Sequence, residues 1–342
     1  MIKSFSTGFI HNKDLTTEKF LLIIIIAYCI VVTLVNPAFL QLSTLFAMIR
    51  SIAGIIVIAS GLLLVVISGG IDVSFTAVAI FGGYSAVRLM LYTGIDNIFF
   101  AFAVACAIGL GLGIFNAVCI HVTRLEPFII TLATSSLFHG VVLTFIGTRN
   151  IAASELPPSI LAFGRMRFFS MPDGFGGTTG LSIFFAFIVT VLLFTWFILY
   201  RTMLGKSIFA LGCSAEAARR AGFSILKTRL FIYGYMGFLG GIMGLLFIGE
   251  IATINPVTLV GTELMIIAAV IIGGARIAGG KGTLLGTVLG VIIMYLTDNT
   301  LIFLGLTSSW NNLFLGVILL FCIAMTSSQE RKKNRKMFIF TE

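Results

Sequence analysis

Long apolar runs, separated by short polar connections, dominate the chain. A helix needs about 20 apolar residues to cross the hydrocarbon core of a bilayer. The runs are continuous, whereas the strands of a transmembrane barrel alternate apolar and polar positions, and lipid offers no water to backbone groups outside a helix. Spans are predicted at residues 20–40, 46–68, 73–92, 97–120, 127–147, 181–200, 229–250, 262–278, 283–300 and 311–326. The pattern predicts an all-α integral membrane protein of about ten transmembrane helices, in a single domain over residues 1–342.

Composition agrees with a membrane location. Of the 342 residues, 58% are hydrophobic and only 10% are charged, and the mean hydropathy is +1.12. A soluble domain needs more polar surface than this. The five cysteines occur singly, without a CxxC pair, so neither a disulfide framework nor a bound metal is predicted.

The net charge of +9 resides mainly in the amino-terminal segment 1–19, the loop 201–228 and the basic tail 327–342. Cytoplasmic segments of membrane proteins carry such an excess of Lys and Arg. Ten spans put both termini on one side, and the charge distribution predicts that this side is cytoplasmic. Because the basic residues lie in the segments expected to be cytoplasmic, no nucleic-acid partner is predicted.

Two connections are long. Residues 148–180 should be external, and their glycine-rich stretch 173–177 should resist regular structure. Residues 201–228 should be internal, with charged residues and alanines alternating from Ala215 to Ala221. This pattern indicates a short amphipathic helix, which either lies at the membrane surface or docks on a cytosolic partner.

Polar residues inside spans are costly and therefore informative. Asp72 follows Gly69 and Gly70, which can interrupt a helix and expose backbone groups to a cavity. The segment is either a hinge or lining of a pathway, or a short turn in which Asp72 caps the next helix. The same choice between pathway and helix packing applies to further polar residues, of which the first three share one helix face: Thr131, Ser135, His139 and Asn116.

No catalytic constellation is found, so an enzyme is not expected. The nearest sequence to a phosphate loop, residues 274–282, does not fit the GxxxxGK[ST] pattern, so any ATP must be bound by another subunit. Glu250 and Glu263 bracket a polar external stretch, and they are expected either to be solvated or to contact an external partner. Glycine pairs predicted as hinges or packing sites are Gly69 and Gly70, Gly273 and Gly274, and Gly279 and Gly280.

Three segments resemble the permease subunits of ribose-type sugar importers driven by ATP-binding cassettes. They are residues 68–74 (SGGIDVS), residues 127–132 (PFIITL) and the block 261–282, within a resemblance that covers about residues 46–325. The resemblance implies the fold of such permeases, a second permease subunit, two ATPase subunits and a solute-binding protein. It also implies a bacterial inner membrane and a translocation path near Asp72, Ser74, Asn116 and Thr131, with Ser135 and His139 on the same face as Thr131.

The internal loop resembles the segment with which such permeases dock on their ATPases. A helix of small residues can sit in a groove of a soluble partner, and a glycine can end it. The matching residues are Gly205, Gly212, Glu216, Ala217, Ala218, Arg219 and Gly222. Branched-chain amino acid permeases share this architecture, so an amino acid or a nucleoside remains an alternative solute. A secondary transporter driven by an ion gradient is a further alternative, although the spans hold few ionisable residues that could relay an ion.

Overall fold

The computed structural model describes residues 14–172, 177–300, 310, 313 and 316–317. In this part of the chain, seven helices are long and apolar enough to cross a membrane. They are α1 (Asp14–Val35), α2 (Leu42–Ile67), α3 (Phe75–Thr93), α4 (Ile98–Thr123), α5 (Pro127–Val141), α7 (Phe184–Arg201) and α10 (Ile225–Ile251). Helix α5 counts among them because a π-helical turn, Val142–Ile146, extends it. The prediction of an all-α membrane protein is confirmed at this level.

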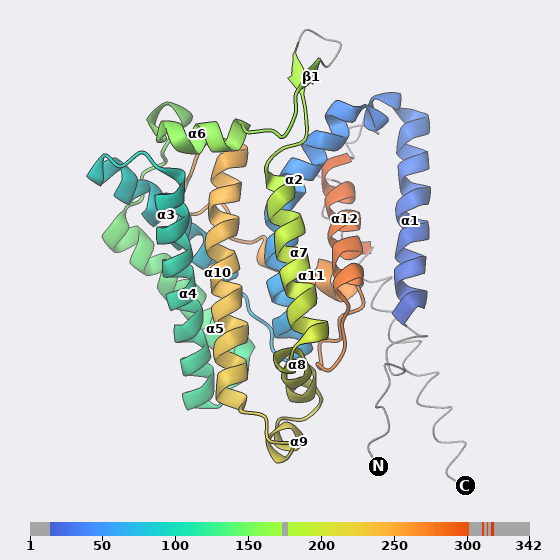
Figure 1. Ribbon diagram of the computed structural model, residues 1–342, viewed down its shortest axis with the longest axis vertical. Coiled ribbons are helices and arrows are strands. Elements are labelled where there is room, and N and C mark those ends of the chain that lie inside the picture. The colour runs from blue at the N-terminus through green and yellow to red at the C-terminus, as the bar shows by residue number, and fades with distance from the viewer. Residues whose placement is uncertain (1–13, 173–176, 301–309, 311–312, 314–315, 318–342) are drawn as a thin grey trace.

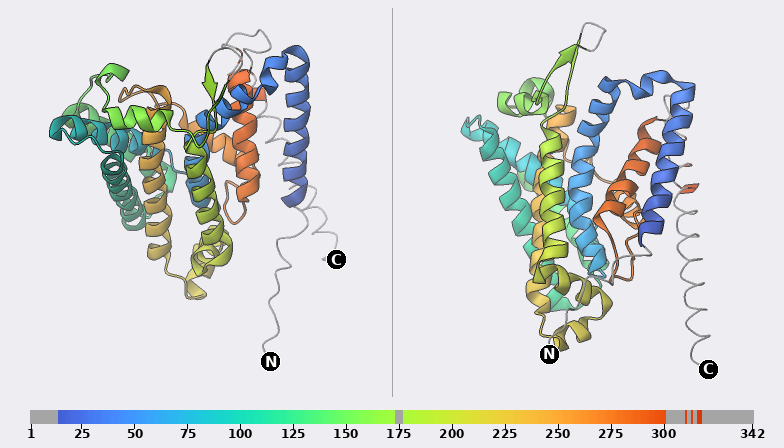
Figure 2. Two further views of the ribbon diagram at one scale, coloured as in Figure 1. Left: turned by 45° about the horizontal axis from the view of Figure 1, so that its top comes forward. Right: turned by 45° about the vertical axis from the view of Figure 1, so that its right-hand side comes forward.

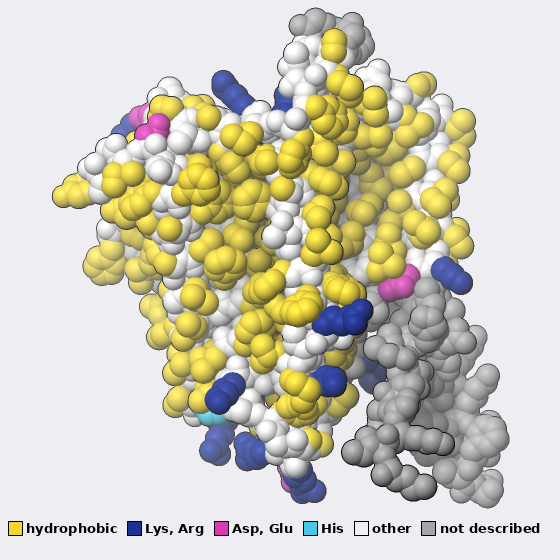
Figure 3. Space-filling model, viewed as in Figure 1, with side chains coloured by type: hydrophobic (Ala, Val, Ile, Leu, Met, Phe, Trp, Pro, Cys, Tyr) yellow, Lys and Arg dark blue, Asp and Glu magenta, His cyan; other side chains and the backbone are white. Residues whose placement is uncertain are grey.

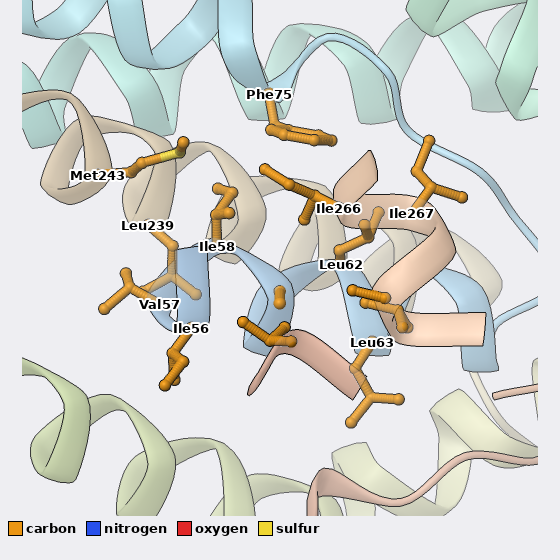
Figure 4. Packing of buried hydrophobic residues seen from close by; sticks show 14 of the residues in the cluster. Ile56, Val57, Ile58, Leu62, Leu63, Phe75, Leu239, Met243, Ile266 and Ile267 are labelled. Carbon is orange, nitrogen blue, oxygen red and sulfur yellow. The ribbon is translucent and has the colours of Figure 1, made fainter. Parts of the chain in front are cut away.

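The helices form one bundle whose axes run along its long dimension (Figure 1). Helices α1 and α12 (Leu284–Thr300) form one flank and α3, α4 and α5 form the other, as the turned views also show (Figure 2). Helices α2 and α10 are largely buried between the flanks. Their side chains, such as Ile58 and Leu239, meet Phe75 of α3 and Ile266 in the core (Figure 4).

Short elements cover the two ends of the bundle. One end carries α6 (Pro158–Arg165) and a two-residue antiparallel ladder, in which β1 (Met171–Pro172) pairs with β2 (Thr178–Thr179). The opposite end carries α8 (Met203–Cys213) and α9 (Ala215–Arg220). Two single 3₁₀ turns lie at Pro37–Leu40 and Ala153–Glu155.

Helix ends follow from local chemistry. Asn97 caps the start of α4, and its side chain accepts a hydrogen bond from the Phe99 amide at 2.8 Å. Ser224 caps α10 in the same way through the Lys227 amide at 3.4 Å. Pro127 begins α5, where its missing amide donor has no helical partner to lose. Polar caps and proline thus divide a nearly continuous apolar sequence into separate helices.

Glycines allow α4 and α10 to approach closely. A Cβ on Gly109 would overlap the carbonyl oxygen of Gly237, and a Cβ on Gly241 would overlap that of Ala105. Small residues four apart bring the backbones of two helices into contact. The close approach at Gly237 and Gly241 therefore fixes α10 against the α3–α5 flank.

One predicted span is much shorter than expected. Residues 262–278 form a helix only over α11 (Glu263–Ile272), which rises about 15 Å, about half of a hydrocarbon core. Gly273 and Gly274 end it, and the loop that follows returns to α12. The predicted span 311–326, the tail 327–342 and most of the glycine-rich stretch 173–177 lie outside the described residues.

Candidate functional site

The segment between α2 and α3, residues 68–74, is a buried break between helices. Helix α2 ends at Ser68, and Gly69 follows with a φ of +83°, a left-handed value that glycine adopts without strain. A Cβ on Gly70 would lie 2.7 Å from the Tyr233 hydroxyl oxygen and 3.3 Å from Pro127 Cβ. A side chain at position 70 would therefore force Tyr233 and Pro127 to shift, which favours glycine at this break.

A hydrogen-bonded network fixes the segment inside the bundle. Asp72 Oδ1 accepts hydrogen bonds from the amide and from the hydroxyl of Ser74, both at 2.7 Å. Ser74 Oγ in turn accepts a hydrogen bond from Asn116 Nδ2 of α4 at 2.7 Å. Thr131 Oγ1 of α5 donates to the Ile71 carbonyl at 3.2 Å, and the Val73 amide donates to the same hydroxyl at 3.3 Å. The four side chains Asp72, Ser74, Asn116 and Thr131 are at most 2% exposed.

Asp72 lies directly before the start of α3. Ser74 occupies the N-cap position of α3, and Asp72 bonds to Ser74 itself, not to an amide of the first helical turn. Asp72 is therefore buried in the turn that leads directly into α3. Ser135 and His139 follow Thr131 on α5, but no hydrogen bond joins them to the network in the part of the chain that the structure describes.

A second polar contact was not predicted from the sequence. Thr76, in the first turn of α3, donates a hydrogen bond to Glu263 at the start of α11. The other carboxylate oxygen of Glu263 accepts from the Gly261 amide at 2.8 Å. The expectation that Glu263 is simply solvated is therefore wrong, because the first turns of the two helices meet at this carboxylate. The 187 positions between the two partners explain why local sequence does not reveal the contact.

Three chain segments at helix ends meet through backbone atoms close to the network. They are the end of α2, the end of α8 and the loop after α11. The Gly280 amide donates a hydrogen bond of 2.8 Å to the carbonyl of Ile67, the last residue of α2. A Cβ on Gly212, at the end of α8, would overlap the same carbonyl and lie 2.6 Å from the Gly280 amide nitrogen. Gly279 packs against Gly212 and Gly69. We call the residues Gly69, Gly212, Gly279 and Gly280 the glycine junction.

The other predicted glycines pack elsewhere. A Cβ on Gly205 would overlap the carbonyl of Leu199, which brings α8 tightly against the end of α7. A Cβ on Gly273 would overlap the Gly286 carbonyl of α12. Gly274 is left-handed with a φ of +93° and faces Thr17 of α1.

Helix α9 projects at the end of the bundle. Ser214 caps it by accepting from the Ala217 amide at 3.2 Å. Ala218 is only 2% exposed and anchors the helix, whereas the side chain of Glu216 is 73% exposed and pairs with Arg220. Gly222 follows with a φ of +86°, and a Cβ there would meet nothing within 4 Å. The exposed residues Glu216, Ala217 and Arg219 thus surround a fixed, buried Ala218.

Cavities lie at this same end. One, of about 260 Å³, is lined by Ser68, Gly70, Glu126, Gly212 and Tyr233 among others, so it adjoins both the buried segment and the glycine junction. Among the described residues, no group of three or more His, Cys, Asp or Glu side chains could hold a metal ion.

Comparisons with known proteins place this architecture among transport proteins. Residues 44–323 match the family described as "Branched-chain amino acid transport system / permease component". The ribose import permease protein RbsC of Escherichia coli (strain K12) is 28% identical over 317 residues, which cover 92% of this chain and 95% of the relative. The autoinducer 2 import system permease protein LsrC of Enterobacter sp. (strain 638) is 30% identical over 322 residues, with 91% and 85% covered.

A further relative is the galactose/methyl galactoside import permease protein MglC of Escherichia coli (strain K12), which is 27% identical over 327 residues. The bundle of apolar helices and the full-length similarity define a multi-pass membrane permease. The chain belongs to the permease-component family that matches residues 44–323. The family resemblance noted in the sequence is thereby confirmed.

Proposed function

We propose that this chain is the membrane-spanning subunit of an ATP-binding-cassette importer that moves a monosaccharide-like solute across the bacterial inner membrane. The observation that carries the proposal is the match of residues 44–323 to a family of transport-system permease components, whose relatives here are named import permeases. Relatives named for ribose and for galactose import favour a sugar as the solute. The chain itself catalyses no reaction in this proposal, and ATP is bound by its partner subunits.

The proposed topology has ten membrane-crossing segments, one of which consists of the half-length helix α11 and its flanking loops, and it has both termini in the cytoplasm. It places the α8–α9 end in the cytoplasm, because the basic residues of the loop 201–228 lie there. Residues 148–180 and 250–262 then face the other side, where a solute-binding protein delivers its cargo. Support for their acting together comes from the pairing of Ile151 with Ile254, whose amides and carbonyls bond at 2.9 and 3.0 Å.

The proposed ATPase contact is α9 with its neighbours. Exposed Glu216, Ala217 and Arg219 meet the partner, while buried Ala218 holds the helix in position. Motion of the ATPase reaches the bundle through Gly212 at the end of α8, which is part of the glycine junction and packs against Ile67 and Gly280. The junction adjoins the segment 68–74, so closure of the ATPases would move the residues of this non-helical segment.

The proposed solute path passes the buried network. Asp72, Ser74, Asn116 and Thr131 lie together near the break, and Ser135 and His139 continue the same face of α5. A second permease subunit, identical or similar, completes the path. In such transporters, irregular backbone at membrane depth is tolerated where it lines a cavity or is covered by protein.

Affinity capture of the tagged chain from its native membranes tests the proposal. The docking variant is Gly222→Asp, which places a side chain in left-handed backbone directly after α9. The matched control is Gly94→Asp, because Gly94 also follows a helix and has a positive φ, of +70°. A Cβ on Gly94 would likewise meet nothing within 4 Å, and Gly94 lies outside the α8–α9 loop. We expect an ATPase subunit to co-purify with the wild type and the control, and to be lost from Gly222→Asp.

The outcomes separate the parts of the proposal. Retention of the ATPase by Gly222→Asp would place docking elsewhere but keep the importer. Absence of an ATPase from all three preparations in mild detergent would overturn the importer itself and favour a gradient-driven transporter.

A branched-chain amino acid is the second candidate solute, because the family description names such transport systems. Uptake by cells that express the complete system distinguishes the two. ATP-dependent accumulation of labelled ribose or galactose, without accumulation of leucine, supports the sugar, and the reverse supports the amino acid.

A further inference from the structure

Basic side chains surround a second cavity, of about 450 Å³, at the α9 end of the bundle. It lies between the last turn of α4, helix α9 and the start of α10. Arg124, Arg219 and Arg229 line it, together with His121 and Val122. Lys and Arg side chains gather at this end below a mostly hydrophobic flank (Figure 3). We name this cavity the basic pocket.

The charge of the basic pocket is not neutralised within the described part of the chain. The described residues form two ion pairs, and neither pair involves a residue that lines the basic pocket. Arg229 makes one long hydrogen bond, from Nη1 to the Ile120 carbonyl at 3.4 Å. The buried Nδ1 of His121 also has no partner among the described residues. Three guanidinium groups around one cavity repel each other, so the pocket is suited to an anion.

The backbone holds one of these arginines in an unusual conformation. Arg124 has a φ of +56°, a left-handed value that is uncommon for residues other than glycine. The neighbouring cavity of about 260 Å³ shares Arg124 and Arg229 and adds the carboxylate of Glu126. One carboxylate beside three guanidinium groups leaves a net positive charge.

An apolar stripe on α4 leads to the basic pocket. Ile114, Val118 and Val122 are four residues apart, lie on one helix face and are 39%, 43% and 72% exposed. Val122, at the end of the stripe, also lines the pocket. The site therefore combines a cationic cavity with an exposed hydrocarbon surface that is continuous with it.

We propose that the basic pocket binds the phosphate head group of an anionic membrane lipid, with an acyl chain lying along the α4 stripe. Basic cavities between membrane helices at the bilayer surface recognise such head groups. A soluble anion would use the guanidinium groups and leave the stripe unused. The bound lipid would connect α9 to the ends of α4 and α10. This inference does not rest on the proposed transport function.

Native mass spectrometry and thermal unfolding of the purified full chain test the proposal. The probes are phosphatidylglycerol, phosphatidylcholine with the same acyl chains, and inorganic phosphate. The variant is Arg124→Gln/Arg229→Gln, and the control is Arg88→Gln, an exposed arginine of α3 away from the pocket. Each guanidinium near an anionic lipid contributes about 1 kcal/mol, or about fivefold in affinity. We expect the double variant to bind phosphatidylglycerol about 25-fold more weakly, and Arg88→Gln and Arg124→Lys to bind it as the wild type does.

Three results would overturn the proposal. Equal binding of the two lipids by the wild type would remove the head-group preference, and this comparison needs no variant to fold. Stabilisation by inorganic phosphate equal to that by phosphatidylglycerol would indicate a soluble anion. Unchanged lipid binding by the double variant, with loss of a co-purifying protein, would assign the pocket to a protein partner.

Discussion

Replacing Ser74 with alanine should release the buried segment 68–74. The Ser74 hydroxyl is the centre of the network, since it donates to Asp72 and accepts from Asn116, both at 2.7 Å. The amide of residue 74 keeps its own bond to Asp72 in the variant, so only the hydroxyl's contribution is lost. The substitution removes a single oxygen and creates almost no cavity.

The expected loss follows from the two bonds. A hydrogen bond to a carboxylate contributes about 1.5 kcal/mol at the low end. A hydrogen bond between membrane helices, such as the one from Asn116, averages only about 0.6 kcal/mol. We expect Ser74→Ala to lower the free energy of unfolding by about 2 kcal/mol. In combination with Asn116→Ala, the two losses should not add, because both variants remove the same interhelical bond.

Reversible unfolding in mixed micelles of a mild detergent and SDS, followed by circular dichroism, measures this loss. Ser136→Ala is the matched control, because Ser136 is exposed on α5 and its hydroxyl donates only to the Leu132 carbonyl at 3.4 Å. The control should stay within about 0.5 kcal/mol of the wild type. A Ser74→Ala protein as stable as the control would refute the view that the network holds the segment.

Two further substitutions test contacts between distant parts of the chain. Gly212→Ala should lower the free energy of unfolding by about 3 kcal/mol in the same assay, since its Cβ would overlap the Ile67 carbonyl. The control Gly111→Ala should be neutral or stabilising, because a Cβ at that position would meet nothing within 4 Å. A Gly212→Ala protein as stable as Gly111→Ala would disprove the close packing. Thr76→Val should cost about 1 kcal/mol because it removes the hydrogen bond to Glu263, and an unchanged midpoint of unfolding would show that this bond does not hold α3 to α11.

The sequence predicts the long helices well because hydropathy reports how much apolar surface a run offers to lipid. It predicts α11 poorly for a physical reason. Residues 262–278 are apolar almost throughout, but the backbone turns at Gly273 and at Gly274, whose φ is +93°. Hydropathy averages side chains and does not register such a turn, so half a helix is counted as a complete span.

The candidate site also has a part that the sequence predicts and a part that it does not. Residues 68–74 were singled out because a carboxylate and two glycines interrupt an apolar run, and the structure places Asp72 in a buried network there. The partners of that network come from α4 and α5, and which of several polar residues reach it depends on helix rotation. Thr131 does so, whereas Ser135 and His139 on the same face do not, because the segment passes only the first turns of α5. The contact of Thr76 with Glu263 depends wholly on how distant helices pack.

The glycine junction and the surface of α9 place different requirements on the residues that form them. The contacts of the junction involve main-chain atoms, including the bond from the Gly280 amide to the Ile67 carbonyl, and they require only that certain positions lack a side chain. The surface of α9 consists of exposed side chains such as Glu216 and Arg219, which can change without disturbing those main-chain atoms. Under the docking proposed for α9, the surface that meets the partner can change while the contacts of the glycine junction are kept. Exchange of the α9 surface between relatives, with the junction glycines retained, is accordingly a practical route to chimaeric transporters.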